Sequence, residues 1–206
     1  MMTLSVQVGA KLSEFQPQNL SNAAWAMATA RLVSGPLLAA MSDQMQAKMQ
    51  RFDPQGIATS AWAFAKVAYK DQPFLDAVAI ASLDKMAEFE AQSLANIAWT
   101  WATLQVATDP LISAVARHAL HQRLIRPLPL TNLIWSLATL KSRWPLEAFA
   151  TRVIAQSSEY NPQQIANTLW GTAKMSHQHQ ALLDCLLKCS AKRLGQFDAQ
   201  NLANIA

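Results

Sequence analysis

Small and polar side chains recur at fixed distances from a tryptophan that returns every 35 to 37 residues. The tryptophans are Trp25, Trp62, Trp99, Trp135 and Trp170. On a helix, the positions six before, three before, one after and four after each tryptophan share one stripe. Their amides, hydroxyls and ammonium groups could contact the backbone or the base edges of a polymer lying across several units. The candidates are Asn19, Asn22, Thr29, Gly56, Thr59, Lys66, Ser93, Asn96, Thr100, Thr103, Asn132, Ser136, Thr139, Gln164, Asn167 and Lys174.

Two recurring positions hardly vary along the chain. Asparagine stands three residues before the tryptophan position in every unit except the second, which has Thr59. Glutamine stands seven before it at Gln18, Gln55, Gln92, Gln163 and Gln200. Residues that repeat unchanged cannot distinguish successive monomers, so they either form a hydrogen-bond ladder between units or contact phosphate or ribose. Base readout would then depend on the varied positions, one base for each unit, with Lys66 and Lys174 on phosphates.

The repeated segment is about 37 residues long, a length typical of helix–turn–helix repeats. In the second unit, Asp53 and Pro54 predict a helix start, and the apolar spacing predicts that this helix reaches Ala68 or Tyr69. Pro73 then opens a second helix that runs to about residue 87. The equivalent prolines are Pro36, Pro110 and Pro145.

One such unit is too small to bury both of its apolar faces, so neighbouring units must stack. We therefore expect an all-α protein, an α-solenoid that winds as a right-handed superhelix. Residues 1–206 form a single array with units at 15–51, 52–88, 89–124, 125–159 and 160–196 and a partial unit at 197–206. The partial last unit, and a helix-tail sequence at residues 11–15, lead us to expect a chain truncated at both ends.

The tryptophan lies midway along the first helix of each unit, with small residues one turn to either side. Three residues after it stand Ala28, Ala65, Ala102, Ala138 and Ala173. Small neighbours leave room for an indole against the adjacent helix, and burying so large a ring would stabilise the stack. We therefore predict that the tryptophans form the core and are not platforms for stacking bases.

Composition and charge limit the classes of protein to which this chain could belong. Of the 206 residues 51% are apolar and 15% are charged, and no stretch approaches the roughly 20 apolar residues of a membrane span. Two cysteines argue against a disulfide scaffold, and residues 1–10 resemble neither a secretory signal nor a transit peptide. Up to Ala116 there are 7 basic and 9 acidic residues, whereas from Arg117 onward there are 10 basic and 4 acidic. A basic half is typical of nucleic-acid-binding proteins.

We expect no metal site. His177 and His179, followed by Cys185 and Cys189, have spacings that zinc could use. Cys185, however, aligns with alanines of the other units, which predicts a small buried residue.

We also expect no enzyme activity and no cofactor. His118 and His121 lie among arginines, without the carboxylate or nucleophile that a catalytic pair needs, and fit a solvated basic face. No phosphate-binding loop, dinucleotide-binding motif or metalloprotease motif occurs in the chain.

The pattern Phe-x-Pro-Gln-x-Leu-Ala-Asn-x-Ala-Trp-Ala-x-Ala-x-Leu, at this spacing, resembles the octotricopeptide and heptatricopeptide repeats of organellar RNA-binding proteins. Related repeats occur in chloroplast translation factors, in FAST-kinase-like mitochondrial proteins and in the RNA-editing substrate-binding complex. The resemblance covers residues 11–206, and the fourth unit departs from it at Ile125, Leu128 and Pro129. Many members end in a nuclease-like domain called RAP, which nothing after Trp170 resembles, and the Pro-Pro-Pro-Glu-type stretch of algal members is absent.

This resemblance implies sequence-selective binding of single-stranded RNA in a mitochondrion or plastid, where such proteins govern transcript stability, processing, editing or translation. The alternative is a protein-binding α-solenoid scaffold, because solenoids also present extended surfaces to peptides. We expect single-stranded RNA as the partner and no membrane contact. A protein partner and a cytoplasmic location stay open.

Overall fold

The computed structural model describes residues 11–106, 110–141, 147–175 and 179–205, and over these ranges the protein is all-α. Its eleven described α-helices are α2 (Pro17–Thr29), α3 (Gly35–Lys48), α4 (Pro54–Lys66), α5 (Gln72–Asp84), α6 (Ala91–Thr103), α7 (Pro110–His121), α8 (Pro127–Thr139), α9 (Glu147–Ala155), α10 (Pro162–Lys174), α11 (Gln180–Ala191) and α12 (Ala199–Ile205). Short 3-10 turns are η1 (Leu12–Glu14), η2 (Met49–Arg51), η3 (Met86–Glu88), η4 (Ser157–Glu159) and η5 (Leu194–Gln196).

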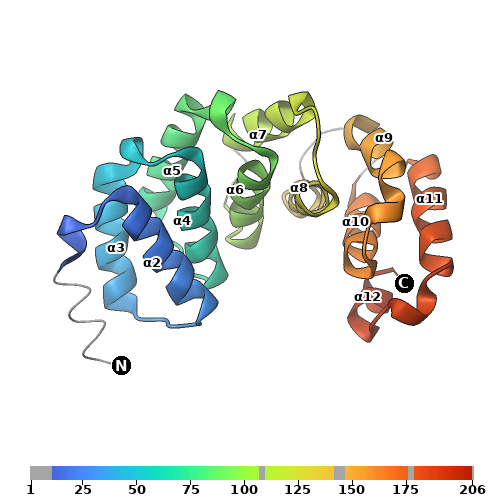
Figure 1. Ribbon diagram of the computed structural model, residues 1–206, viewed down its shortest axis with the longest axis horizontal. Coiled ribbons are helices and arrows are strands. Elements are labelled where there is room, and N and C mark those ends of the chain that lie inside the picture. Colours follow the sequence, from blue (N-terminus) through green and yellow to red (C-terminus); the bar gives the residue numbers. More distant parts are fainter. Residues whose placement is uncertain (1–10, 107–109, 142–146, 176–178, 206) are drawn as a thin grey trace.

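Most of the helices pack on the second-next helix along the chain. α2 packs on α4, α4 on α6, α6 on α8, α8 on α10 and α10 on α12. Of the intervening helices, α3 packs on α5, α5 on α7 and α9 on α11. Adjacent helices such as α4 and α5 also contact each other, which is the packing expected of stacked helical hairpins. The hairpins follow one another along an arch, with the even-numbered helices toward its inner side (Figure 1).

The helices begin where the sequence predicts and end slightly earlier. Asp53 caps α4, because its Oδ1 accepts a hydrogen bond from the Gly56 amide at 2.7 Å. α4 ends at Lys66 because Ala68 has a left-handed backbone, with φ of 55°. The Tyr69 amide can then donate to the Phe64 carbonyl at 2.9 Å and close the helix. Residues Arg31, Gln105 and Lys141 have the same left-handed turn.

The second helices also differ in detail from the predicted ones. α5 ends at Asp84, before the expected residue 87, because the chain tightens into the 3-10 turn η3. Pro36, Pro73 and Pro110 lie in the first turns of α3, α5 and α7, whereas Pro145 lies outside the described residues.

The prediction that the repeated tryptophans form the core is only partly correct, because Trp62 and Trp99 pack against the core but keep part of their surface exposed. Trp25 is 50% exposed. The others, Trp62, Trp99, Trp135 and Trp170, are partly buried. The residue five before each tryptophan fills the space between the first helices and is fully buried in all five units. These residues are Leu20, Ile57, Leu94, Leu130 and Ile165. The small residues beside each tryptophan let neighbouring helices approach closely, so the indole is left at the edge of the contact.

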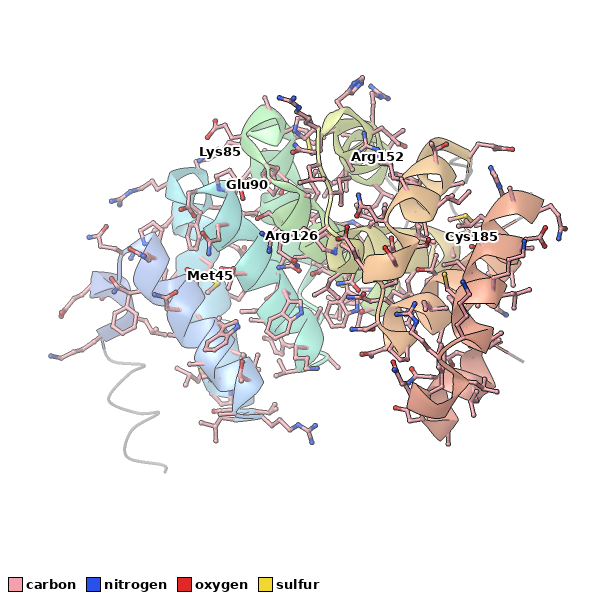
Figure 2. The ribbon with its side chains drawn as sticks, turned by 45° about the vertical axis from the view of Figure 1, so that its right-hand side comes forward. Met45, Lys85, Glu90, Arg126, Arg152 and Cys185 are labelled. Carbon is pink, nitrogen blue, oxygen red and sulfur yellow. The ribbon has the colours of Figure 1, made fainter. Side chains whose placement is uncertain are left out.

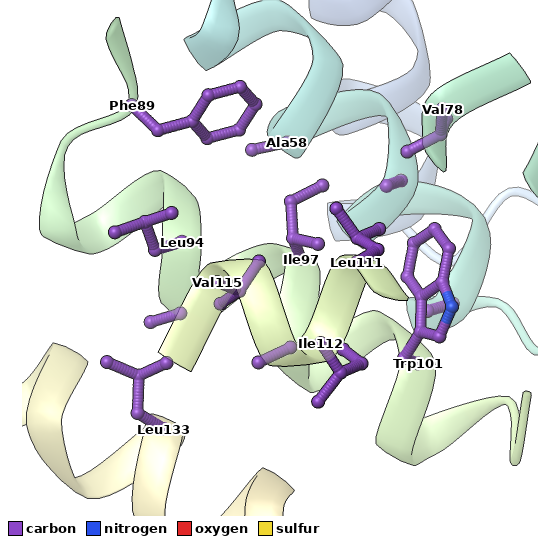
Figure 3. Close-up of a cluster of buried hydrophobic side chains, with 14 of the residues drawn as sticks. Ala58, Val78, Phe89, Leu94, Ile97, Trp101, Leu111, Ile112, Val115 and Leu133 are labelled. Atoms are coloured by element: carbon purple, nitrogen blue, oxygen red, sulfur yellow. The ribbon is translucent and has the colours of Figure 1, made fainter. Parts of the chain in front are cut away.

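One tryptophan outside the repeated series is in the core. Trp101, two residues after Trp99, is 1% exposed. Figure 3 shows its indole in a cluster of buried side chains from α5, α6 and α7, which includes Val78 and Leu111. The position two after each repeated tryptophan therefore points inward, and in the second, fourth and fifth units it holds Phe64, Leu137 and Thr172, all 0% exposed.

Long polar side chains clamp each hairpin to the preceding one. Lys48 Nζ donates to the Ser13 and Phe15 carbonyls at 2.7 and 2.9 Å. Lys85 repeats this contact one unit later, with the Gln50 carbonyl at 2.8 Å and the Phe52 carbonyl at 2.6 Å. Arg152 binds the Leu120 and Gln122 carbonyls of the preceding unit. Gln122 and Arg193 bind the carbonyl of the first residue of their own units, Phe89 and Tyr160, as Lys85 does with Phe52. For Lys48, Lys85 and Arg193 the sequence predicts favourable interactions with helix dipoles, whereas the structure shows that these side chains bind specific carbonyl oxygens.

Replacing Lys85 with methionine is expected to lower the free energy of unfolding by about 1.5–3 kcal/mol, because two carbonyls lose a charged donor. The measurement is chemical denaturation followed by circular dichroism. Lys70→Met, at an exposed lysine in the turn after α4, is the matched control. Equal denaturation midpoints for both variants would show that the clamp adds nothing to stability.

Tyr160 stands where most units have phenylalanine, and its hydroxyl is buried without a hydrogen-bond partner. Burial raises the pKa of this phenol well above its usual range, and the nearby Glu159 charge adds to the shift. We expect Tyr160→Phe to raise the free energy of unfolding by about 1 kcal/mol at neutral pH, because an unsatisfied buried group is removed.

The effect of Tyr160 should grow in alkali. Above pH about 10 the phenol of the unfolded chain loses its proton while the folded protein keeps it, so stability falls as pH rises. Denaturation at pH 8 and at pH 10.5 should show a smaller loss for Tyr160→Phe than for the parent. Tyr69 is present in both proteins, so an equal loss would show that Tyr160 does not contribute to the pH dependence.

Candidate nucleic-acid interface

The repeated tryptophans share an exposed row with the residues seven before, three before and four after them. Spacings of four and three residues place these positions one above another on one side of a helix. We call this surface the tryptophan face. Its members are Gln18, Asn22, Trp25 and Thr29 on α2; Gln55, Thr59, Trp62 and Lys66 on α4; Gln92, Asn96, Trp99 and Thr103 on α6; Leu128, Asn132, Trp135 and Thr139 on α8; Gln163, Asn167, Trp170 and Lys174 on α10; and Gln200 and Asn204 on α12. All of them are exposed or partly buried.

Rings of neighbouring helices meet on the tryptophan face. The Trp62 and Trp99 ring centroids are 6.3 Å apart and their planes are inclined by 34°. Trp135 and Trp170 repeat this arrangement at 6.2 Å and 28°. The close packing of α4 on α6 and of α8 on α10 brings these rings together. Two pairs of aromatic rings therefore lie at the surface, where they can stack with planar ligands.

Cations lie beside two of these rings. Lys66 Nζ is 6.0 Å from the Trp62 ring centroid, and Lys174 Nζ is 5.6 Å from that of Trp170. Both lysines are exposed and stand one turn after their tryptophan. The ammonium group of each lysine can attract an anion and also contacts the face of the indole.

Amide groups lie on the other side of the rings. Gln92 Nε2 donates to Asn96 Oδ1 at 3.0 Å, and Gln200 Nε2 donates to Asn204 Oδ1 at 3.3 Å. Asn204 Nδ2 donates in turn to Asn167 Oδ1 at 3.2 Å, which joins α12 to α10. The inter-unit ladder predicted for these asparagines is thus present at one junction. Each amide has more donors and acceptors than these bonds use.

Six of the predicted site residues are outside the tryptophan face. Gly56, Ser93, Thr100 and Ser136 are buried, whereas Asn19 and Gln164, six residues before their tryptophans, are exposed and partly buried in the first turns of α2 and α10. Thr100 and Ser136 donate to main-chain carbonyls of their own helices, at 2.9 and 2.6 Å. The predicted stripe therefore combines two sets of positions. Those three before and four after the tryptophan are exposed or partly buried, whereas most of those six before and one after it are buried.

The predicted residues other than the four buried ones stay at the surface. The exposed ones are Asn19, Asn22, Thr29, Lys66, Thr103 and Lys174, and the partly buried ones are Thr59, Asn96, Asn132, Thr139, Gln164 and Asn167. Asn19 Oδ1 and Gln164 Oε1 accept amide hydrogen bonds at the starts of α2 and α10, from Gln16 and Asn161. Their side chains therefore have a capping role in these helices.

The two edges of the tryptophan face differ in charge. Arg31, Lys66, Lys141 and Lys174 are exposed at the carboxyl ends of α2, α4, α8 and α10. At the opposite edge, Asp53, Glu90 and Asp198 precede α4, α6 and α12, and Arg126 precedes α8. Glu90 and Arg126 are labelled in Figure 2. A polyanion lying across the helices is therefore attracted more strongly to the edge formed by their carboxyl ends.

No model of a known protein family matches this chain, and no curated protein matches it at a significant level. Over the part of the chain that the structure describes, no helix has the length and apolar character needed to cross a membrane.

One cysteine of α11, Cys185, differs from its predicted environment. Cys185 is partly exposed, although its alignment with alanines predicts burial, while Cys189 packs against the core. His179 Nδ1 accepts a hydrogen bond from the Leu182 amide at 3.2 Å and caps the helix, and His177 lies outside the described residues. Among the residues whose placement is described, no group of three His, Cys, Asp or Glu side chains could hold a metal ion.

Proposed function

We propose that the chain binds single-stranded RNA, with selectivity for sequence, on the tryptophan face of an α-solenoid that winds as a right-handed superhelix of about 37-residue repeats. The observation that carries the proposal is the row of partly exposed indoles with lysines at 5.6 and 6.0 Å from two ring centroids. Aromatic platforms within a cationic surface are the means by which proteins bind single strands, because every base has a face that can stack. The repeat resemblance supports a role in RNA stability, processing, editing or translation in a mitochondrion or plastid.

Two of the first helices, α4 and α10, each offer three kinds of contact to a nucleotide. Lys66 and Lys174, near the carboxyl ends of their helices, would bind phosphates. The indoles would stack with bases, and the amides of the asparagine row would reach base edges or ribose. Selectivity would come from the position four after the tryptophan, which varies between units: it is lysine in α4 and α10 and threonine in α2, α6 and α8.

A binding experiment with a lysine variant tests this proposal. Fluorescence anisotropy of a labelled random-sequence single-stranded RNA should show affinity that falls as salt rises, because bound phosphates release counterions. Lys66→Ala/Lys174→Ala should weaken binding and reduce the slope of log affinity against log salt by about 0.7 for each lysine. Lys188→Ala/Lys192→Ala, which removes the same charge from exposed positions at the end of α11, is the control.

Two results would contradict the proposal. Equal losses in the two double variants would indicate a nonspecific effect of charge. Absence of binding at micromolar concentrations of helical protein would favour the alternative, a scaffold whose tryptophan face binds peptides. Duplex DNA should bind more weakly than the single strand, because its bases are not free to stack on indoles.

A further inference from the structure

A basic surface lies at the turn from α7 to α8, next to the tryptophan face. Between Asp109 and Glu147 the sequence has four arginines, one lysine and no acidic residue. Three of the arginines, Arg117, Arg123 and Arg126, are exposed, and we call them the basic corner. Within the described ranges their side chains form no ion pair or hydrogen bond. Their charges are therefore available to an anionic ligand.

Hydrogen bonds to the main chain hold this turn in place. The Arg152 guanidinium of α9 donates to the Leu120 and Gln122 carbonyls at 2.6 and 2.7 Å. The side-chain amide of Gln122 donates in turn to the Phe89 carbonyl at 3.0 Å. The turn is thus tied both to α9 and to the segment before α6. A ligand that binds the basic corner does not have to order the main chain, so binding loses little conformational entropy.

Acidic residues occupy the matching position of three other units. The second residue of the unit is Asp53, Glu90 or Asp198 in the second, third and sixth units, whereas it is Arg126 in the fourth. All four side chains are exposed. A polyanion that leaves the tryptophan face past the starts of the first helices is therefore repelled at α4, α6 and α12 and attracted at α8.

Cations also stand beyond both ends of α8. Arg126 precedes this helix and Lys141 follows it, and both are exposed. Leu128, the first member of the tryptophan face on α8, stands two residues after Arg126. Arg123 in the turn and Arg117 on α7 continue the cations away from the face. A strand can therefore pass from the face to the basic corner without meeting an acidic residue of α8 or of this turn.

From this arrangement, and resting on the proposed RNA binding, we infer that a flank of the bound strand leaves the tryptophan face over the start of α8 and lies on the basic corner. Arginine suits this contact, because its guanidinium donates two parallel hydrogen bonds to one phosphate. The contact reads no base, since phosphates are the same in every sequence. The substrate is therefore a single strand longer than the roughly six nucleotides that six units would hold.

Strand length separates the basic corner from the tryptophan face in a binding experiment. Labelled random-sequence single-stranded RNAs of about six and about twelve nucleotides are compared, because one nucleotide for each unit uses up the shorter strand. Fluorescence anisotropy measures the affinity of the parent protein and of Arg123→Ala/Arg126→Ala at about 50 and 200 mM salt. Lys188→Ala/Lys192→Ala, which removes the same charge from α11, is the control. Circular dichroism confirms that each variant is helical.

We expect the arginine variant to lose affinity for the longer strand only. Its slope of log affinity against log salt should fall by about 1.4, or 0.7 for each lost phosphate contact, which makes the loss about sevenfold greater at 50 than at 200 mM salt. The shorter strand should bind parent and variant within about twofold.

Three results would overturn the inference while leaving RNA binding intact. These are equal losses for the two strand lengths, the same loss in the control variant, and an unchanged affinity for the longer strand. The last result would favour an acidic protein segment as the ligand of the basic corner. If the parent protein binds neither strand at micromolar concentration, the proposed function itself fails.

Discussion

Replacing Trp101 with alanine is expected to lower the free energy of unfolding by about 3–5 kcal/mol, the usual cost of removing a large buried aromatic side chain. Its indole is 1% exposed and contributes to the core built by α5, α6 and α7. Removal would leave a cavity that rigid helix contacts cannot close. The measurement is urea denaturation followed by circular dichroism.

Trp99 provides a matched control two residues away on the same helix. It is partly exposed and contacts Trp62 at the surface. Trp99→Ala should therefore cost about 1 kcal/mol, the value of an aromatic pair. Comparable losses from the two substitutions would mean that the tryptophan face is part of the core, and would remove the basis for a binding role.

The second large effect concerns RNA affinity. Trp62→Ala/Trp99→Ala removes one complete ring pair, and two lost stacks of about 1–3 kcal/mol each correspond to at least about thirtyfold weaker binding. Anisotropy with single-stranded RNA measures this loss, and circular dichroism of the helices confirms that the variant is folded. Leu83→Ala, which removes an exposed apolar side chain from α5, should leave affinity unchanged. Binding within twofold of the parent protein would place the RNA elsewhere on the surface.

The helical unit could be predicted from local signals in the sequence. Asp53 and Pro54 start α4 as expected, because capping and the fixed φ of proline act within one turn. The end of α4 could not be predicted as well from the sequence, because Ala68 adopts a left-handed conformation that its residue type does not favour. Tertiary contacts of the hairpin, rather than local preference, select this turn.

The orientation of the tryptophan could not be predicted in the same way. Ile57 and Phe64 share one side of α4, and Trp62 is on the opposite side, roughly 140–160° around the helix. Both sides are therefore apolar, and the pattern does not show which of them meets the next helix. The alanines one turn to either side of each repeated tryptophan fit two geometries. They could leave room for the indole ring, or they could let the backbones of two helices approach closely. The structure has the second, and Ala58 and Ala61 are buried between helices while Trp62 lies at the rim.

The clamps between hairpins have a consequence for how such an array can grow. Lys48, Lys85 and Arg152 bind carbonyl oxygens of the preceding unit, which every residue possesses, and not a particular side chain. A duplicated unit therefore meets a compatible neighbour at once, with no second mutation needed to complete the junction. Duplication of one unit can therefore lengthen the array, while the outward-facing residues of each unit diverge independently.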